Sequence, residues 1–220
     1  MKIYPHRLHG IFESGKKLLT KDLGPRESVY GERLVKGDDG MYRVWDPSRS
    51  KLGAALTRGV SQIGIKPGST VLYLGCSTGT TVSHVSDMVG SEGKIYALDV
   101  APRVLRELMF LAEKRPNIVP ILADANNPTT YAQFVEAVDV VFMDIAQSNQ
   151  VEIFTKNCQA FLSHNGFGLL ALKSRSIDIS KKPKQIYDEA RRQLEKSVKI
   201  VDYKTLDPYE ADHAFYVCKQ

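Results

Sequence analysis

The sequence predicts an α/β fold in which a doubly wound, mostly parallel seven-stranded sheet follows a small N-terminal antiparallel β appendage. Beyond residue 70, short apolar runs alternate with segments of helical periodicity, a pattern typical of parallel strands joined by helices. Several of these runs end at a glycine or a charged residue, as expected where the carboxyl ends of parallel strands meet. Residues 1–46 lack this alternation, so they are expected to form the appendage and residues 47–220 the main domain.

The N-terminal segment contains short apolar stretches separated by turn sequences such as Leu23-Gly24-Pro25. These stretches predict strands of a small antiparallel sheet, over residues 11–12, 17–20, 33–35 and 41–44. A sheet of this size buries too little apolar surface to be stable alone, so we expect it to pack on the main domain. Residues 45–50 are interpreted as a linker, and apolar residues at helical spacing predict a helix over 51–63.

The stretch 70–99 is expected to form a strand, a glycine turn, a helix and a second strand. Gly79 permits a tight turn, and Thr80 or Thr81 is expected to cap the helix that follows. The second strand ends at Asp99, whose carboxylate suits the two hydroxyls of a ribose. Because a helix start offers free N–H groups to an anion, the whole unit predicts a nucleotide-binding site.

The spacing of Gly75 and Gly79 narrows the choice of nucleotide. The dinucleotide fingerprint G-x-G-x-x-G and the phosphate loop G-x-x-x-x-G-K-[ST] are both absent from this turn. Two glycines four residues apart suit a nucleoside that carries a carboxylate and no pyrophosphate, a description that fits S-adenosylmethionine (SAM). The competing interpretation is an ordinary core turn of an α/β protein, because short glycine-rich turns are common.

The alternation continues to the C-terminus. Helical periodicity predicts helices over 102–115, 129–136, 151–162 and 184–196. Apolar runs predict strands over 95–98, 118–122, 138–143, 166–172, 198–203 and 214–218. No helix is evident between the last two strands, so they are expected to form an antiparallel hairpin at the sheet edge.

Charged side chains at the strand ends are the most informative pattern for function. Asp124 and the backbone of Ala125 are placed to contact an adenine. Asp144 ends a strand beside the first one, near a reactive methyl group, and Lys173 ends the next strand and can reach the same space. An acid next to a lysine can orient a hydroxyl and stabilise its oxygen as the proton leaves. The alternative for this pair is a structural salt bridge.

Composition adds weaker constraints. The 220 residues carry a net charge of +5, which favours an anionic partner such as RNA. Cys76, Cys158 and Cys218 are scattered, so we expect neither a disulfide framework nor a metal site, and a reducing compartment is the default. The chain has no apolar signal core and no apolar stretch of about 18 residues, so a cytoplasmic location without a membrane contact is expected.

The motifs together resemble the fibrillarin family of guide-directed RNA ribose 2′-O-methyltransferases, and most of all its short archaeal form. The matching segments cover nearly the whole chain: YPHRLHGIFE at 4–13, RVWDPSRSKLGAAL at 43–56, VLYLGCSTGTTVSHVSDMVG at 71–90, RPNIVPILADANNP at 115–128, VDVVFMDIAQSNQ at 138–150 and PYEADHA at 208–214. The resemblance implies that residues 47–220 form a SAM-dependent methyltransferase domain.

The resemblance also implies site residues. Four side chains would serve methyl transfer, and two of them have no signal of their own in the sequence: Lys51, Asp144, Lys173 and His213. The SAM contacts implied by the family, together with the glycine turn, fall on Gly75, Cys76, Thr80, Thr81, Asp99, Val100, Asp124, Ala125, Asp144, Ile145, Ala146 and Gln147.

The implied partners are those of a box C/D ribonucleoprotein: a guide RNA, its target rRNA or tRNA, a coiled-coil scaffold protein and a kink-turn-binding protein. Two other functions stay open on the residues alone. One is a SAM-dependent methyltransferase acting on a protein or a small molecule, since a fold does not fix a function. The other is a non-catalytic assembly subunit that binds partners through the β appendage.

Overall fold

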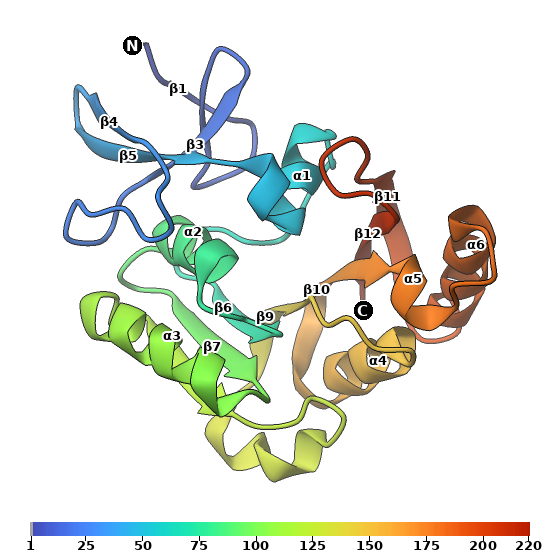
Figure 1. Ribbon diagram of the computed structural model, residues 1–220. Coiled ribbons are helices and arrows are strands. Elements are labelled where there is room, and N and C mark those ends of the chain that lie inside the picture. Colours follow the sequence, from blue (N-terminus) through green and yellow to red (C-terminus); the bar gives the residue numbers. More distant parts are fainter. Residues whose placement is uncertain (1) are drawn as a thin grey trace.

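The computed structural model describes residues 2–220 and contains two sheets (Figure 1). The larger, seven-stranded sheet has the order β11-β12-β10-β9-β6-β7-β8. Its strands are β6 (Thr70–Leu74), β7 (Lys94–Asp99), β8 (Ile118–Leu122), β9 (Val138–Met143), β10 (Leu162–Lys173), β11 (Lys199–Thr205) and β12 (His213–Lys219). Only β12 runs against its neighbours, β10 and β11, which confirms both the mostly parallel sheet and the antiparallel hairpin at its edge.

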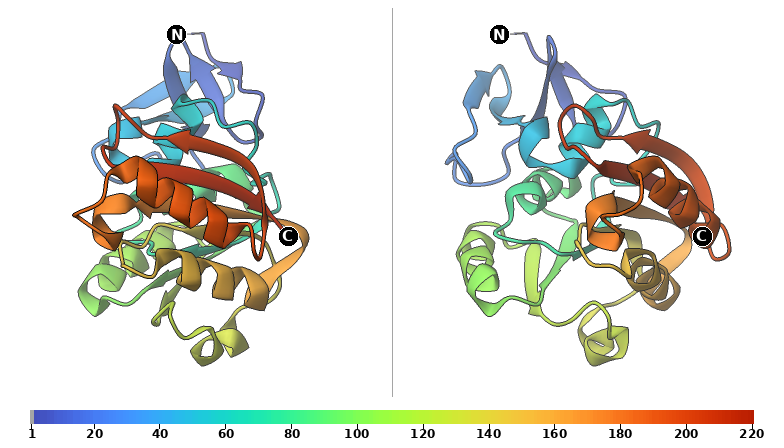
Figure 2. Two further views of the ribbon diagram at one scale, coloured as in Figure 1. Left: turned by 90° about the vertical axis from the view of Figure 1, so that its right-hand side faces the viewer. Right: turned by 45° about the vertical axis from the view of Figure 1, so that its right-hand side comes forward.

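Helices cover both faces of this sheet. Alternate residues of each strand enter different cores: Val71 and Tyr73 point to one face, Leu72 and Leu74 to the other. The first face packs against α1 (Lys51–Thr57), α2 (Thr80–Val89) and α3 (Pro102–Lys114). The second packs against α4 (Gln150–Phe161) and α6 (Pro183–Leu194), the side that Figure 2 turns towards the viewer. The doubly wound arrangement is therefore confirmed.

The N-terminal sheet has five antiparallel strands in the order β1-β2-β3-β5-β4. They are β1 (Tyr4–Pro5), β2 (Phe12–Ser14), β3 (Lys17–Lys21), β4 (Leu34–Gly37) and β5 (Gly40–Trp45), of which β1 was not predicted. Ile11, Leu18 and Trp45 join the same core as α1 and α2, so the sheet packs on the main domain as expected. The division into domains at residues 46 and 47 stays a prediction.

A buried ionic network holds this sheet against α2. The Arg43 guanidinium, on β5, donates to Asp87 of α2 at 2.8 Å and to Glu32 at 2.7 Å. Arg115 reaches the other Asp87 oxygen at 2.5 Å, and all of these side chains are at most 1% exposed. The network also fixes His84, whose ring stacks on Trp45 with centroids 4.5 Å apart. The two sheets are thus joined by compensated charge as well as by apolar contact.

Several predicted elements differ from the structure. The helix predicted over 51–63 ends at Thr57, because Arg58 caps it by donating to the carbonyls of Ala54 and Leu56. The segment 129–136 forms two short 3₁₀ turns, η2 (Pro128–Thr130) and η3 (Ala132–Phe134), since only isolated positions there reach the core and Phe134 is 59% exposed. A short helix, α5 (Ser174–Ile177), was not predicted.

Two further corrections concern the segments beside the site. Residues 45–50 were predicted as a linker, but Trp45 is 1% exposed and η1 (Pro47–Arg49) forms a 3₁₀ turn. Thr80 and Thr81 were predicted to cap α2, but the N-cap is Gly79, with φ +97°. This backbone angle favours glycine, and a Cβ at Gly79 would also lie 2.5 Å from Leu111 Cδ2, so the leucine side chain would have to move.

Candidate functional site

A cavity of about 240 Å³ opens at the carboxyl ends of β6, β7, β8 and β9. This is the edge at which a doubly wound sheet binds its ligands. Its lining includes nine of the residues predicted to bind the cofactor: Gly75, Asp99, Val100, Asp124, Ala125, Asp144, Ile145, Ala146 and Gln147. Ser77, Leu98 and Ala123 complete it. The sequence therefore located the cavity. That these nine residues bind a cofactor stays a prediction.

The glycine turn and Asp99 form one wall of the cavity. Gly75 has φ +81°, and a Cβ there would lie 2.6 Å from the carbonyl oxygen of Asp144, so only glycine lets β6 and β9 approach so closely. Asp99 accepts backbone N–H bonds from Ser77 and Ala101, each at 3.0 Å. A carboxylate has about four lone-pair positions, so Asp99 is held in place and can still accept two hydroxyl groups.

A polar chain closes the opposite wall. Asp124 Oδ1 accepts from the backbone and the side-chain amide of Asn126, each at 2.9 Å, and these bonds lower its pKa. Asn126 also donates to Gln147 Oε1 at 3.1 Å. The other Asp124 oxygen has no hydrogen bond among residues 2–220 and is available to an amino group. Val100, 61% exposed, adds an apolar surface on which a base can lie.

Three residues predicted to contact the cofactor do not line this cavity. Cys76 is buried beneath the turn, and burial raises the pKa of its thiol. The Thr81 hydroxyl donates to Ser50 Oγ at 2.9 Å, inside the core. Thr80 lines a neighbouring cavity of about 310 Å³ between residues 25–30 and α3. Their contacts with a cofactor stay predictions.

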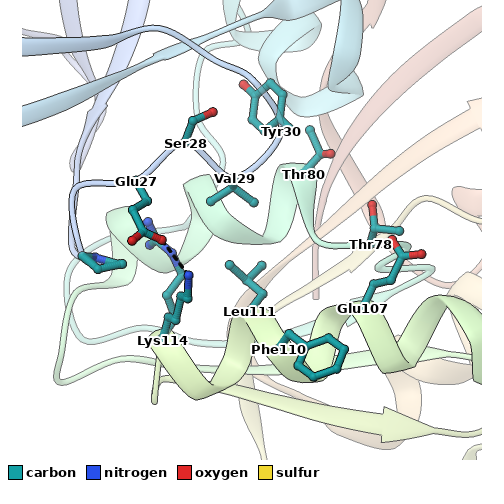
Figure 3. A pocket seen from close by; sticks show the side chains of 12 residues that line it. Glu27, Ser28, Val29, Tyr30, Thr78, Thr80, Glu107, Phe110, Leu111 and Lys114 are labelled. Atoms are coloured by element: carbon teal, nitrogen blue, oxygen red, sulfur yellow. Dashed lines mark hydrogen bonds and ion pairs between the residues drawn. The ribbon is translucent and has the colours of Figure 1, made fainter.

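Figure 3 shows this neighbouring cavity. Val29, Leu111 and Phe110 give it an apolar lining, and Thr78 and Thr80 lie at the end nearest the glycine turn. Glu27 and Lys114 point towards one another, 2.6 Å apart, and tie the N-terminal segment to α3. The pair neutralises itself, and Glu107 is the one lining carboxylate without an ion pair among residues 2–220, whereas Asp99 and Asp124 both lack one in the other cavity.

The lysine in contact with Asp144 is Lys51. Its ammonium lies 3.1 Å from Oδ1 and 3.3 Å from Oδ2. Burial raises the pKa of Asp144 above its ordinary value, and the Lys51 charge opposes part of that shift. Both side chains keep a partial opening, 25% for Lys51 and 17% for Asp144. Reasoning from strand ends alone placed Lys173 beside Asp144; no ion pair joins the two within residues 2–220, and the shared role of Lys173 and Asp144 stays a prediction.

His213 contributes a neutral imidazole beside this ion pair. Its Nδ1 lies 2.7 Å from the carbonyl oxygen of Ala211, and because a carbonyl only accepts, Nδ1 carries the proton. Burial lowers the pKa of His213, so the neutral form is favoured. Nε2 is then an acceptor, and it is buried with no partner among residues 2–220. Such an unsatisfied atom is costly, which is typical of a site that a substrate completes.

Lys173 reaches the same end of the sheet through the register of β10. It pairs directly with His213 of β12, so the two side chains stand next to each other on one face. Gln150 holds its backbone: Gln150 Oε1 accepts from the Lys173 N–H at 2.9 Å, and Nε2 donates to the Lys173 carbonyl at 3.0 Å. Pairing of β10 with β9 ends at Leu170, so the Gln150 side-chain amide takes the place of the β9 backbone as the hydrogen-bond partner of Lys173.

Sequence reasoning missed two residues of this site. Ser77 lines the cavity and fixes Asp99, and its only signal was its place inside the glycine turn. Gln150 is completely buried at the start of α4. The sequence offered no indication of this role, because nothing in it predicts which backbone groups the Gln150 amide would contact.

The sheet order, the glycine turn and the acids around the cavity define the class of protein. An α/β domain that offers carboxylates to a nucleoside at this edge, without a phosphate loop, has the architecture of the SAM-dependent methyltransferases. The fibrillarin family model matches residues 3–220. The chain belongs to the fibrillarin family.

Known relatives agree over the full length. A fibrillarin-like rRNA/tRNA 2′-O-methyltransferase from Thermococcus gammatolerans is 48% identical, with all of both chains covered. Aeropyrum pernix fibrillarin, solved with natively bound S-adenosyl-L-methionine, is 39% identical with a TM-score of 0.91, covering 99% of this chain and 98% of that one. A fibrillarin/Nop5p complex is 37% identical, with a TM-score of 0.90, and covers 97% and 99%.

Proposed function

We propose that this protein transfers the methyl group of SAM to ribose 2′-hydroxyls of rRNA and tRNA, directed by a guide RNA within a box C/D ribonucleoprotein. The observation that carries the proposal is the Lys51–Asp144 pair beside a neutral, unpartnered His213, at the rim of a nucleoside-sized cavity. The family's names support the substrate: the relative from T. gammatolerans is named as an rRNA/tRNA 2′-O-methyltransferase.

The cavity residues fit SAM. Asp99 is held by two backbone N–H groups and keeps acceptor capacity for ribose hydroxyls. Asp124 keeps a free oxygen for an adenine amino group, beside the exposed Val100. Gly75 lets the turn approach the backbone of Asp144 closely, so both stand at the cavity wall. When bound there, SAM supplies a methyl group on a positively charged sulfur.

The chain's own residues then act on the ribose hydroxyl. We propose that Asp144 accepts a hydrogen bond from the 2′-hydroxyl, orients its oxygen and receives the proton as the oxygen attacks. Lys51, 3.1 Å from Asp144, stabilises the negative charge that develops on that oxygen. Lys173 and His213, neighbours in the strand register, complete the polar cluster. Positioning and electrostatics are the contributions expected of the protein here.

The same family evidence supports proposals for the partners and the compartment. The solved fibrillarin/Nop5p complex supports a scaffold partner, and we propose that a kink-turn-binding protein completes the particle. The chain has no helix long and apolar enough to cross a membrane within residues 2–220. We propose the cytoplasm as the compartment, because rRNA and tRNA, named for the archaeal relatives, are found there.

The test is methyl transfer in an assembled particle. Purified chain, guide RNA, scaffold protein and kink-turn protein are mixed with target RNA and labelled SAM, and the modified nucleotide is identified after digestion. We expect label on the 2′-oxygen of one guide-selected ribose. Label on protein, or no transfer by a properly assembled particle, rejects the proposal. Equilibrium binding of SAM is measured separately, and we expect Asp99→Ala to weaken it. This measurement distinguishes an inactive enzyme, which still binds SAM, from an assembly subunit that binds no cofactor.

A further inference from the structure

A second, positively charged cleft lies between the N-terminal sheet and the segments that carry Lys51 and His213. Its volume is about 360 Å³. Four cations line it: Lys16, Lys17, Arg33 and Arg49. All four are exposed, and none forms an ion pair within residues 2–220. The distinguishing feature is that these four unpaired cations line one cleft.

The two carboxylates in the lining do not cancel this charge. The Glu32 side chain is 1% exposed, is neutralised by Arg43 at 2.7 Å and accepts backbone N–H bonds from Val29 and Tyr30. Asp46 accepts the N–H of Ser48 as the cap of η1, and its single negative charge faces four cations. The cleft therefore presents net positive charge to the solvent, and its ligand is expected to be an anion.

Arg49 is held ready for such a ligand. Its guanidinium lies over the Tyr30 ring, 5.0 Å from the centroid, and Nη1 donates to the Tyr30 carbonyl at 2.9 Å. A guanidinium has five N–H donors, so this bond leaves most of them free. A fixed arginine loses less conformational entropy on binding a phosphate than a mobile one.

The cleft is next to the reaction centre. Arg49 lies two residues before Lys51, and Tyr209, which also lines the cleft, lies four residues before His213. Both segments that deliver cationic or polar groups to Asp144 therefore border it. If the target ribose of an RNA strand lies at Asp144, the phosphates of the neighbouring nucleotides are expected to lie near this cleft.

We propose that this cleft binds the phosphate backbone of the RNA strand or duplex that carries the target ribose. The inference rests on the proposed function, and it assigns to the N-terminal sheet a share of substrate binding. Base pairing with a guide supplies sequence specificity, so the chain needs contacts that position the backbone without reading bases. Four unpaired cations, with one arginine fixed by Tyr30, provide such contacts.

The experiment measures binding without catalysis. The full chain is titrated against a fluorescently labelled guide–target RNA duplex at several salt concentrations, and the double variant Lys16→Glu/Lys17→Glu is compared with Lys196→Glu/Lys199→Glu. The control removes two exposed, unpaired lysines at the opposite end of the sheet and changes the net charge equally. We expect the cleft variant to bind about tenfold more weakly, with a salt slope lower by about two, and the control to stay within about twofold of the wild type.

Each other outcome has a defined meaning. Equal losses in both variants, or no measurable duplex binding by the wild type, overturn the proposal. If the cleft variant instead fails to bind the scaffold protein in the absence of RNA, the cleft is a protein-docking surface and the proposal is wrong. Wild-type protein that binds the duplex through the cleft but transfers no methyl group rejects the proposed function alone. Thermal melting of both variants confirms that they fold.

Discussion

Two carboxylates, Asp87 and Asp144, lie in very different surroundings although both are largely buried. The Asp87 side chain is 0% exposed and accepts hydrogen bonds from Arg43, Arg115, the Thr20 hydroxyl and the backbone of Leu23. Asp144 is 17% exposed and has one cationic contact, Lys51. Asp87 thus has its charge compensated inside the protein, whereas Asp144 has acceptor capacity left over.

The same contrast applies to the two histidines nearby. Thr20 donates its hydroxyl proton to Asp87, so His84 Nδ1, 2.8 Å away, must donate to Thr20, and Nε2 accepts from Tyr30. Both nitrogens of His84 are satisfied. His213 keeps Nε2 without a partner. A saturated polar cluster stabilises a fold, and an incomplete one is available for chemistry.

The largest effect is expected from Asp144→Asn. This change removes the group that receives the proton, so methyl transfer should fall by about 10²–10⁴-fold. The variant should melt no earlier than the wild type, because it also removes the cost of a buried carboxylate. The measurement is single-turnover transfer in the assembled particle together with thermal unfolding. Retained activity would show that Asp144 is structural, as Asp87 is.

Asp87→Asn should give the opposite result. Arg43 would keep Glu32 and Arg115 would keep Asp22, but an asparagine has one acceptor oxygen where Asp87 has two. Buried donors would be left unpaired, and the free energy of unfolding should fall by about 1–3 kcal/mol. Denaturant unfolding measures this, and SAM affinity of the remaining folded protein should be unchanged. Asp188→Asn, on the exposed side of α6, is the matched control and should change stability by less than about 0.5 kcal/mol. A comparable loss in the control would remove the contrast.

Gln150→Leu tests the positioning of Lys173. It removes both hydrogen bonds to the Lys173 backbone and leaves those groups unpaired, at a cost of about 1–3 kcal/mol. We expect a slower transfer step at saturating SAM and target RNA. Gln159→Leu makes the same substitution on the exposed side of α4 and should leave the transfer rate unchanged. Equal rates in both variants would deny Gln150 a positioning role.

The smallest effect concerns pH. The pKa of Asp144 is raised in the folded protein from its usual 3.8, so the protonated form favours folding. This stabilisation is complete below pH 3.8 and is lost as the pH rises through the folded pKa. The unfolding free energy of the wild type minus that of Asp144→Asn should therefore fall as pH increases over this window. A difference independent of pH would mean that Asp144 does not titrate abnormally.

A second pH effect has the opposite sign. Burial lowers the pKa of His213 from 6.5 and that of His84 well below 6.5. Their contribution to stability is complete above pH 6.5 and is lost as the pH falls through the folded values. Denaturant unfolding between pH 5 and 7 should follow this direction, and His84→Asn should weaken it.

The sequence by itself determined the alternation of strands and helices, the position of the glycine turn and the acids at the strand ends. These are local signals: apolar runs, a backbone angle that needs glycine, and polar residues where a strand leaves the core. The same reasoning failed over 51–63 and 129–136, where the core contacts of neighbouring elements decided how far helical periodicity was realised.

Only the tertiary structure decided which side chains meet. Lys51 starts a helix more than ninety residues before Asp144, and His213 lies far beyond it, so no spacing along the chain brings them together. Their contact depends on strand order, on the register that sets Lys173 opposite His213, and on the N-cap of α1 at Ser50. Pairwise distances are properties of packed elements, because each side chain's partner is chosen by the fold and not by its neighbours in sequence.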